Sequence, residues 1–160
     1  SIGALEELFL NKGEVMELEL ARILPVLLKL HAKTAQFFES ALQHCCDVIV
    51  ESIPSKRFCS VMISIGESKS PKVQAAIANL YCSSITKCNE NKEKFFSKLS
   101  DELIYLIKTV NNMLNGSSPQ IRQSARNIVC QLYLFYGEDL TKAVKKTLSG
   151  NDANQFLQNT

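Results

Sequence analysis

The chain has 160 residues, of which 46% are hydrophobic and 21% charged, values typical of one soluble globular domain with a continuous core. Its formal net charge of +2 is too small for a dense nucleic-acid-binding surface. No apolar run approaches the roughly 18 residues of a membrane-spanning helix, so we expect neither nucleic acid nor a membrane as a partner.

Apolar residues recur at spacings of three and four along most of the chain, and glycine or proline interrupts this pattern at intervals. In 98–115, for example, Leu99, Leu103 and Leu106 fall on one helical face. The period predicts helices at 3–10, 14–31, 34–52, 55–66, 71–88, 98–115, 119–136, 138–148 and 151–158. No segment alternates apolar and polar residues for long enough to form a strand, so the predicted fold class is all-α.

Two of these helix starts repeat nearly the same pattern. Residues 70–78 and 118–126, which lie 48 positions apart, each open with Ser-Pro. Serine suits the N-cap, and proline suits the first helical position, where its missing N–H costs nothing. The match predicts that Val73 and Ile121 are buried at equivalent places.

A weaker third copy at 34–41 places Phe38 at the position of those two buried residues. Each copy also carries a small residue that would let its helix pack closely on a neighbour. These residues are Ala41, Ala76 and Ala125. The spacing of the copies is within the range of helical-hairpin repeats.

Repeated hairpins predict the geometry of the whole chain. One hairpin cannot bury its apolar face alone, so the hairpins stack side by side into a solenoid. The turns within hairpins then line up along one edge, the intra-hairpin edge, at 31–34, 66–71 and 115–119. The turns between hairpins line up along the opposite, inter-hairpin edge, at 52–55, 88–97 and 136–138.

The helix starts at 70–78 and 118–126 resemble HEAT repeats, which open their second helix with small, hydrophobic and basic residues in this order. The succession of segments, from Leu24-Pro25-Val26-Leu27-Leu28-Lys29 to Tyr136-Gly137-Glu138-Asp139-Leu140, is similar to the C-terminal half of a TOG domain of the CLASP and crescerin group. This resemblance implies a HEAT-repeat α-solenoid of stacked antiparallel helical hairpins. It also implies that residues 1–160 are a single TOG-like domain or the C-terminal part of a longer TOG domain.

The function implied by the resemblance is that of a binding module rather than an enzyme. TOG domains bind αβ-tubulin through their intra-repeat turns, so we expect a microtubule-regulatory module in the cytoplasm and the cytoskeleton. It would contact tubulin itself or support a neighbouring TOG domain, and ciliary and general cytoplasmic roles both stay open. The alternative is a HEAT-repeat scaffold that grips a helix or peptide of a non-tubulin partner.

Carried over by position, the resemblance implies a tubulin-binding set of Lys33, Lys69, Lys72 and Arg122. Lys69 and Ser70 match the basic and small polar residues that often precede the second helix of a repeat. Arg122 matches the base that follows the hydrophobic residue of the helix start. Lys69 has an alternative as an ordinary solvated lysine, and Arg122 has one as a structural link.

The sequence also departs from the TOG pattern. Polar or acidic residues stand at four positions where the family often has bases, namely Gln36, Glu39, Gln74 and Ser117. The family has an aromatic anchor in its first turn, which the chain lacks because it contains no Trp. The structural alternative for Arg122 is a pairing along its own helix or with Asp139.

Charge is distributed unevenly along the chain. Residues 1–50 contain four basic and seven acidic residues, whereas 51–160 contain 14 and nine. A basic second half would attract an acidic partner. Five of its bases fall near the inter-hairpin edge, namely Lys56, Arg57, Lys92, Lys94 and Lys98. We interpret 89–94, which contains two of them, as a solvated loop.

Six cysteines and two histidines form no pattern typical of a metal or catalytic site. There is no C-x-x-C pair and no zinc-ligand spacing, so we expect neither a metal nor a cofactor. Most cysteines fall on apolar helical faces, which predicts buried, reduced thiols in a cytosolic or nuclear protein. His44 adjoins Cys45 and Cys46, but neighbouring helical residues point to different faces. With no phosphate-binding loop either, we expect no enzymatic activity.

Overall fold

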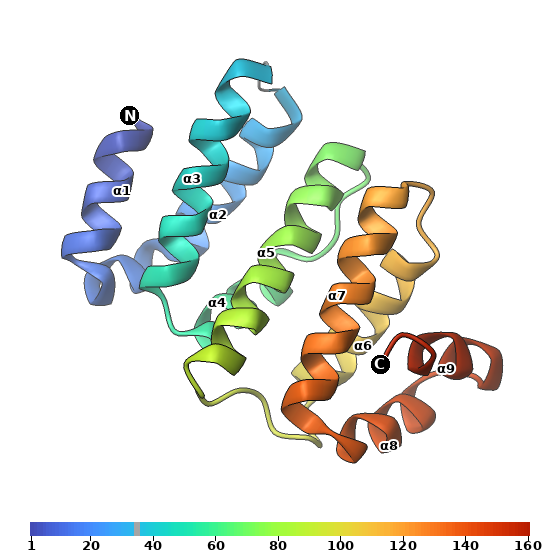
Figure 1. Ribbon diagram of the computed structural model, residues 1–160. Helices are drawn as coiled ribbons and strands as arrows, with labels where there is room; N and C mark the ends of the chain where they lie inside the picture. The colour runs from blue at the N-terminus through green and yellow to red at the C-terminus, as the bar shows by residue number, and fades with distance from the viewer. Residues whose placement is uncertain (34–35) are drawn as a thin grey trace.

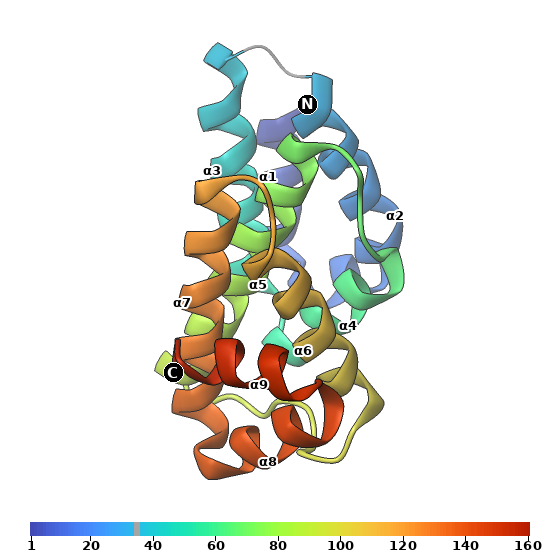
Figure 2. The same ribbon diagram turned by 90° about the vertical axis from the view of Figure 1, so that its right-hand side faces the viewer.

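The computed structural model describes residues 1–33 and 36–160, and its regular structure there is entirely helical. The helices are α1 (Ile2–Asn11), α2 (Gly13–Lys33), α3 (Gln36–Ser52), α4 (Ser55–Ile65), α5 (Pro71–Glu90), α6 (Asp101–Leu114), α7 (Pro119–Tyr136), α8 (Glu138–Thr147) and α9 (Gly150–Leu157). Helices α1, α3, α5 and α7 form one layer (Figure 1), and α2, α4 and α6 form a second (Figure 2). Helices α8 and α9 close the C-terminal end. The predicted all-α solenoid of stacked hairpins is confirmed.

The largest error in the predicted helix boundaries is at the start of α6. This helix begins at Asp101 rather than 98 because Ser100 is its N-cap, with Oγ accepting a hydrogen bond from the backbone N of Leu103 at 3.3 Å. Leu99 lies in the preceding loop with 76% of its surface exposed, so its assignment to the apolar face was wrong. The predicted helix start at 34 lies outside the described residues, and α3 is described from Gln36.

Helices α5 and α7 begin in the same way, as the 48-residue match predicted. Pro71 and Pro119 are their first residues. Val73 is 8% exposed and Ile121 is 4% exposed, which confirms that both are buried. Among the described residues, α5 packs more extensively against α7 than any other two helices pack, so the two helices with matching starts are direct neighbours.

The weaker third copy, on α3, was wrong as a packing prediction. Phe38 is 51% exposed and Ala41 is also exposed, whereas Ala76 and Ala125 are buried as expected. The first layer is less closely packed between α3 and α5 than between α5 and α7. A groove of about 730 Å³ lies between α3 and α5 and is also lined by His31 of α2 and by the start of α7. The exposed Phe38 and Ala41 are not part of its lining.

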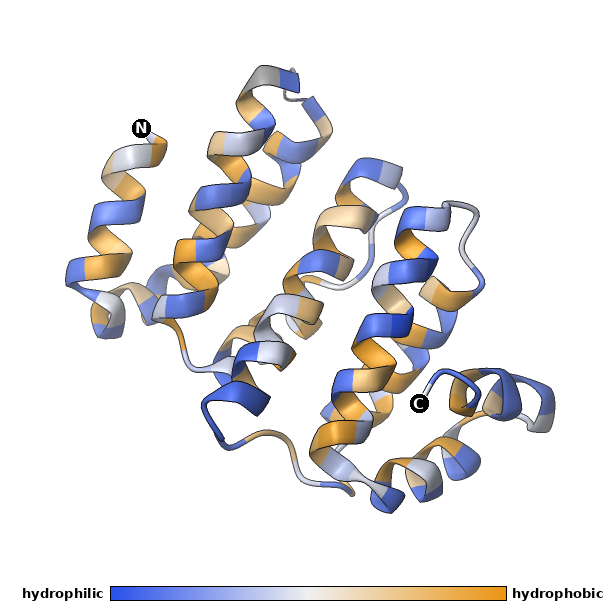
Figure 3. Cartoon of the chain, viewed as in Figure 1, coloured by the Kyte–Doolittle hydropathy of each residue, from blue (hydrophilic) through white to orange (hydrophobic). Residues whose placement is uncertain are grey.

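The core lies between the two layers. Figure 3 shows hydrophobic and hydrophilic residues sharing each helix, as expected when one face packs inward. Fully buried side chains come from every helix from α1 to α9 and include Phe9, Phe58, Tyr81, Leu103 and Phe156. Burial of one leucine or phenylalanine side chain contributes roughly 1.5–3 kcal/mol to folding.

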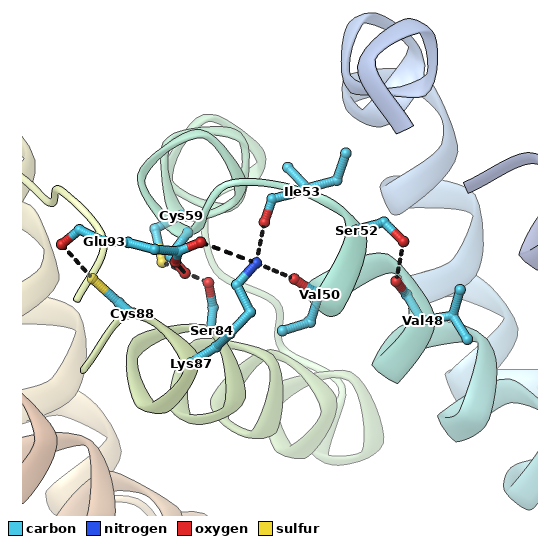
Figure 4. Close-up of polar contacts among 10 residues, drawn as sticks. Val48, Val50, Ser52, Ile53, Cys59, Ser84, Lys87, Cys88 and Glu93 are labelled. Atoms are coloured by element: carbon cyan, nitrogen blue, oxygen red, sulfur yellow. Dashed lines mark hydrogen bonds and ion pairs between the residues drawn. The ribbon is translucent and has the colours of Figure 1, made fainter. Parts of the chain in front are cut away.

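A buried lysine joins α3 to α5 at the inter-hairpin edge (Figure 4). Lys87 is only 5% exposed, and its Nζ donates to the carbonyl oxygens of Val50 at 2.7 Å and Ile53 at 2.5 Å. Its ammonium also lies 3.5 Å from a carboxylate oxygen of Glu93. The hydroxyl of Ser55 donates to the other oxygen of that carboxylate. Lys87 thus satisfies carbonyls at the C-terminal end of α3 that no helical N–H reaches.

The loop 91–100 between α5 and α6 is fixed by more than this ion pair. Phe95 and Phe96 are buried against Phe135 and Tyr136, with ring centroids of Phe95 and Phe135 5.7 Å apart. The hydroxyl of Tyr136 donates to the carbonyl of Phe96 at 2.8 Å. The predicted solvated loop at 89–94 is therefore wrong for Glu93. It is also wrong for residues 89–90, which end α5, although Lys92 and Lys94 are exposed as expected.

Candidate binding surface

The two edges predicted from the hairpin pattern are present. Figure 1 shows the facing ends of α2 and α3, the α4–α5 turn and the α6–α7 turn at the same end of the two layers. The second of these turns spans 66–70 and the third spans 115–118, whereas 34–35 in the first lie outside the described part of the chain. The α3–α4, α5–α6 and α7–α8 connections lie at the opposite end.

The second intra-hairpin turn, 66–70, has a fixed backbone. Gly66 ends α4 with φ of 83°, a left-handed conformation that glycine adopts at little cost. The Oγ of Ser68 accepts a hydrogen bond from the backbone N of Ser70 at 3.2 Å. The amide Nε2 of Gln74 donates to the carbonyl of Ser68 at 2.7 Å. Lys69 is exposed in the middle of this turn.

The third turn, 115–118, is held by an equivalent bond. The guanidinium Nη1 of Arg122 donates to the carbonyl of Gly116 at 2.7 Å and to that of Ser117 at 3.0 Å. In the 48-residue match, Arg122 corresponds to Gln74 and Gly116 corresponds to Ser68. In each case a backbone carbonyl of the connection accepts a hydrogen bond from a side chain six residues later, at the start of the following helix. We call these two connections the stapled turns and each such hydrogen bond a staple.

Sequence reasoning did not find this role of Arg122. It suggested a pairing along α7 or with Asp139, but a carboxylate oxygen of Asp139 lies 3.6 Å from the Nζ of Lys98 at the inter-hairpin edge. Gln74, which we interpreted only as a missing base, is the neutral counterpart of Arg122. The alignment of positions 74 and 122 was the signal that could have revealed the shared bond.

The four predicted tubulin-binding residues lie on three neighbouring turns. Lys69 and Lys72 flank the start of α5, Arg122 lies in the first turn of α7, and Lys33 is the exposed last residue of α2. The Nζ of Lys72 lies 3.8 Å from a carboxylate oxygen of Glu39, with both side chains more than half exposed. Such exposed pairs contribute about 0–1 kcal/mol, so this contact links α3 and α5 only weakly.

A small pocket lies between the second and third turns. It has a volume of about 110 Å³, and Ile77, Met113 and Ile121 form its apolar lining. The amide of Asn112 donates to a carboxylate oxygen of Glu67 at 3.2 Å, bridging α6 to the second turn beside this pocket. No local sequence pattern could predict this pocket, because its lining comes from three helices.

His44 forms a polar contact between α1 and α3. Its Nδ1 lies 2.9 Å from a carboxylate oxygen of Glu6, and the hydrogen bond and charge of this carboxylate raise the pKa of His44 above the ordinary value of 6.5. A raised pKa in the folded state adds stability below the unfolded-state value, and this stability is lost as pH rises through the folded-state pKa. The contact between α1 and α3 is therefore stronger in mildly acidic solution.

We expect the His44 resonance in an NMR titration to have its midpoint above 6.5, since Glu6 favours the imidazolium. In Glu6→Gln the midpoint should fall toward 6.5, because the amide keeps the shape but not the charge. Glu7→Gln, at the exposed neighbouring position, should leave the midpoint unchanged. Equal effects of the two substitutions would refute a specific bond to Glu6.

The cysteines do not have the environment of reactive thiolates. All six are free thiols, and Cys45, Cys46, Cys59 and Cys88 are buried. Burial raises the pKa of Cys45 to about 11 and that of Cys46 to about 12, so both are protonated at neutral pH. His44 contacts Glu6 rather than either thiol. Among the described residues, no group of three or more His, Cys, Asp or Glu side chains is arranged to hold a metal ion.

The helices in the described ranges are too short or too polar to cross a membrane. Comparison with known protein families agrees with the helical architecture. None of the curated proteins matches the sequence. The model of the family described as CLASP N terminal matches residues 1–154, a range that includes all of α1 to α8 and both stapled turns. The chain therefore belongs to the CLASP N-terminal family, a family of non-enzymatic, microtubule-associated domains with TOG-like helical repeats.

Proposed function

We propose that this chain is a TOG-like microtubule-regulatory module that contacts αβ-tubulin through its intra-hairpin edge or supports a neighbouring TOG domain that does. The proposal rests on the second and third turns, which are stapled in equivalent ways and carry Lys69 and Arg122. Lys33 and Lys72 flank them. Membership of a microtubule-associated family supports a partner of this kind.

We also propose that residues 1–160 are the C-terminal part of a longer TOG domain. Large apolar side chains are exposed on α1 and α2, at the end of the solenoid opposite α9. Leu10 is 65% exposed, Val15 61% and Leu18 75%. Solenoids cover such faces with the next repeat or with a polar cap. A preceding HEAT repeat would bury these side chains.

The affinity for tubulin is expected to be low for this chain alone. Each exposed charge pair adds about 0–1 kcal/mol to binding. Arg122 already donates two hydrogen bonds to its own turn, and Lys72 is paired with Glu39. The other two predicted bases on this edge, Lys69 and Lys33, are both exposed to an acidic partner. Binding should therefore weaken with added salt.

Lys69→Glu combined with Arg122→Gln should weaken tubulin binding by about tenfold or more, since both changes remove positive charge from the intra-hairpin edge. Glutamine at 122 can keep the staple, because Gln74 makes the same bond in the second turn. Co-elution with αβ-tubulin at low salt on size exclusion gives the measurement. The helical circular dichroism spectrum and the melting temperature should stay close to those of the parent chain.

The matched control carries the same change of charge on the other edge, as Lys92→Glu with Lys94→Gln. It should bind tubulin as the parent chain does. If this control loses binding and the first variant keeps it, the inter-hairpin edge is the working surface and the TOG-like mechanism is wrong. Gln74→Arg, which places a base at the position equivalent to Arg122, should strengthen binding.

The second candidate function is a HEAT scaffold for a non-tubulin partner. The groove of about 730 Å³ between α3 and α5 favours it, because a groove of this size accommodates a segment of another chain. The groove reaches the intra-hairpin edge, where Pro71, Lys72 and Ser118 are part of its lining. If the parent chain does not co-elute with tubulin at any salt concentration, this scaffold function becomes the leading proposal.

A further inference from the structure

A third hollow lies on the inter-hairpin edge, between the loop 91–100, the start of α6 and the outer side of α8. It has a volume of about 270 Å³. Its apolar part is formed by Leu99, Ile104 and Ala143, and its polar part includes Lys98 and two lysines of α8. We call it the α8 groove.

The lysines of the α8 groove are more numerous than the acidic residues beside them. Lys142 and Lys146 are exposed and lie four residues apart, so they share one face of α8. Like charges at this spacing repel each other. Among the described residues that line the groove, one is acidic, Asp139, and it is paired with Lys98. The C-terminal end of a helix carries partial negative charge, which explains a lysine at position 146 in the last turn of α8. It does not explain the lysines at positions 142 and 98.

The stability of the fold does not explain why a leucine at position 99 is exposed. Leu99 is 76% exposed, yet it lies on a segment whose backbone is fixed at both ends. Phe95 and Phe96 are buried on one side of it. On the other side, the hydroxyl of Ser100 donates to the carbonyl of Ser97 at 2.6 Å and also caps α6. Leu99 is therefore presented to solvent by a rigid support.

The positive charge continues along the same edge. At the other end of the loop 91–100, a shallow hollow is lined by Lys56, Arg57 and Lys94 together with Glu93. The charge of Glu93 is already offset by Lys87, and Arg57 lies 3.8 Å from Glu17. Lys56 and Lys94 remain as exposed positive groups there. A negatively charged chain lying along this edge would meet lysines at both ends of the loop.

We propose that the α8 groove binds an extended acidic peptide segment of a partner protein. Carboxylates at alternate positions of an extended chain are about 6.6 Å apart and face one side. This separation suits Lys142 and Lys146, whose Cβ atoms are about 5–6 Å apart as residues four positions apart on a helix. A large aliphatic side chain further along the peptide then contacts Leu99 and Ile104. The groove lies opposite the intra-hairpin edge, so both surfaces can be occupied together.

The test uses the full chain and a fluorescein-labelled peptide with two glutamates at alternate positions followed by a leucine. Its anisotropy should report saturable binding that weakens with salt. Lys142→Glu with Lys146→Glu should reduce the affinity about tenfold or more, and Leu99→Ser should also reduce it. These side chains are exposed, so circular dichroism should show an unchanged fold. Lys69→Glu with Arg122→Gln is the control and should bind the peptide normally.

The proposal is overturned if the α8 variant binds the peptide as tightly as the parent chain. It is also overturned if replacing the peptide leucine with serine changes nothing while phosphatidylserine vesicles or duplex DNA compete equally well. That result would identify a general anion-binding patch rather than a peptide site. Because tubulin is absent from these measurements, their outcome is separate from that of the tubulin co-elution experiment on the intra-hairpin edge.

Discussion

Replacing Ile121 with Asp is expected to unfold the C-terminal repeats. Ile121 is 4% exposed in the first turn of α7, which packs against α5 in the most extensive helix contact of the protein. A carboxylate placed there without a charged or hydrogen-bonding partner costs several kcal/mol, against a total stability of about 5–15 kcal/mol for a domain. Urea denaturation followed by circular dichroism measures the loss.

Two further substitutions make this test specific. Ile121→Val removes one methyl group and should cost only about 0.5–1.5 kcal/mol, so it separates lost volume from buried charge. Val73→Asp places the carboxylate at the equivalent position of α5 and should be comparably damaging, because Val73 is 8% exposed. If either aspartate variant melted within a few degrees of the parent chain, the equivalence of the two helix starts would be refuted.

The helices could be predicted from the sequence because their information is local. Apolar spacing and Ser-Pro starts fix where α5 and α7 begin, whatever packs against them. Phe38 shows the limit of this reasoning. Its pattern resembles that of Val73, yet Phe38 is 51% exposed, because burial also needs a second helix packed on the same face. Whether an apolar residue is covered depends on the neighbouring helices, which a local pattern does not specify.

The candidate binding surface was predictable only in outline. The alignment of turns follows from hairpin stacking, and Lys69 is exposed as a turn residue should be. The bonds of Gln74 and Arg122 to their turns could not be seen, because side-chain direction decides them. The sequence analysis left Arg122 open as a tubulin contact or a structural link, and it counted Gln74 only as a missing base. In the structure, the side chains of Gln74 and Arg122 each hold a turn in place.

Lys87 is the clearest residue that sequence reasoning missed. A lysine in the last turn of a helix is normally solvated, and cations there also favour the helix end. Here the carbonyls that bind it belong to Val50 and Ile53, 37 and 34 residues earlier in the chain. Only the close approach of α3 to α5 creates that binding position. Glu93 completes it from a loop that local composition marks as solvated.

Lys87→Met is expected to destabilise the protein by about 3 kcal/mol. Methionine preserves most of the apolar volume but leaves two buried carbonyls without their donor and Glu93 without its counter-ion. Breaking a fully buried ion pair costs about 3–5 kcal/mol, and the 24% exposure of the Glu93 side chain places this case toward the lower end. The melting temperature should fall on the order of 10 °C in a thermal scan.

Lys94→Met is the matched control for Lys87→Met, because Lys94 is exposed on the same edge, and it should change stability by less than about 0.5 kcal/mol. Lys87→Met with Glu93→Gln should recover part of the loss, since no uncompensated carboxylate then remains. Equal stability of Lys87→Met and Lys94→Met would show that the buried junction does not exist.

The buried junction also anchors the loop 91–100. Lys87→Met should therefore speed hydrogen exchange in this loop and weaken peptide binding at the α8 groove, although Lys87 itself does not line that groove.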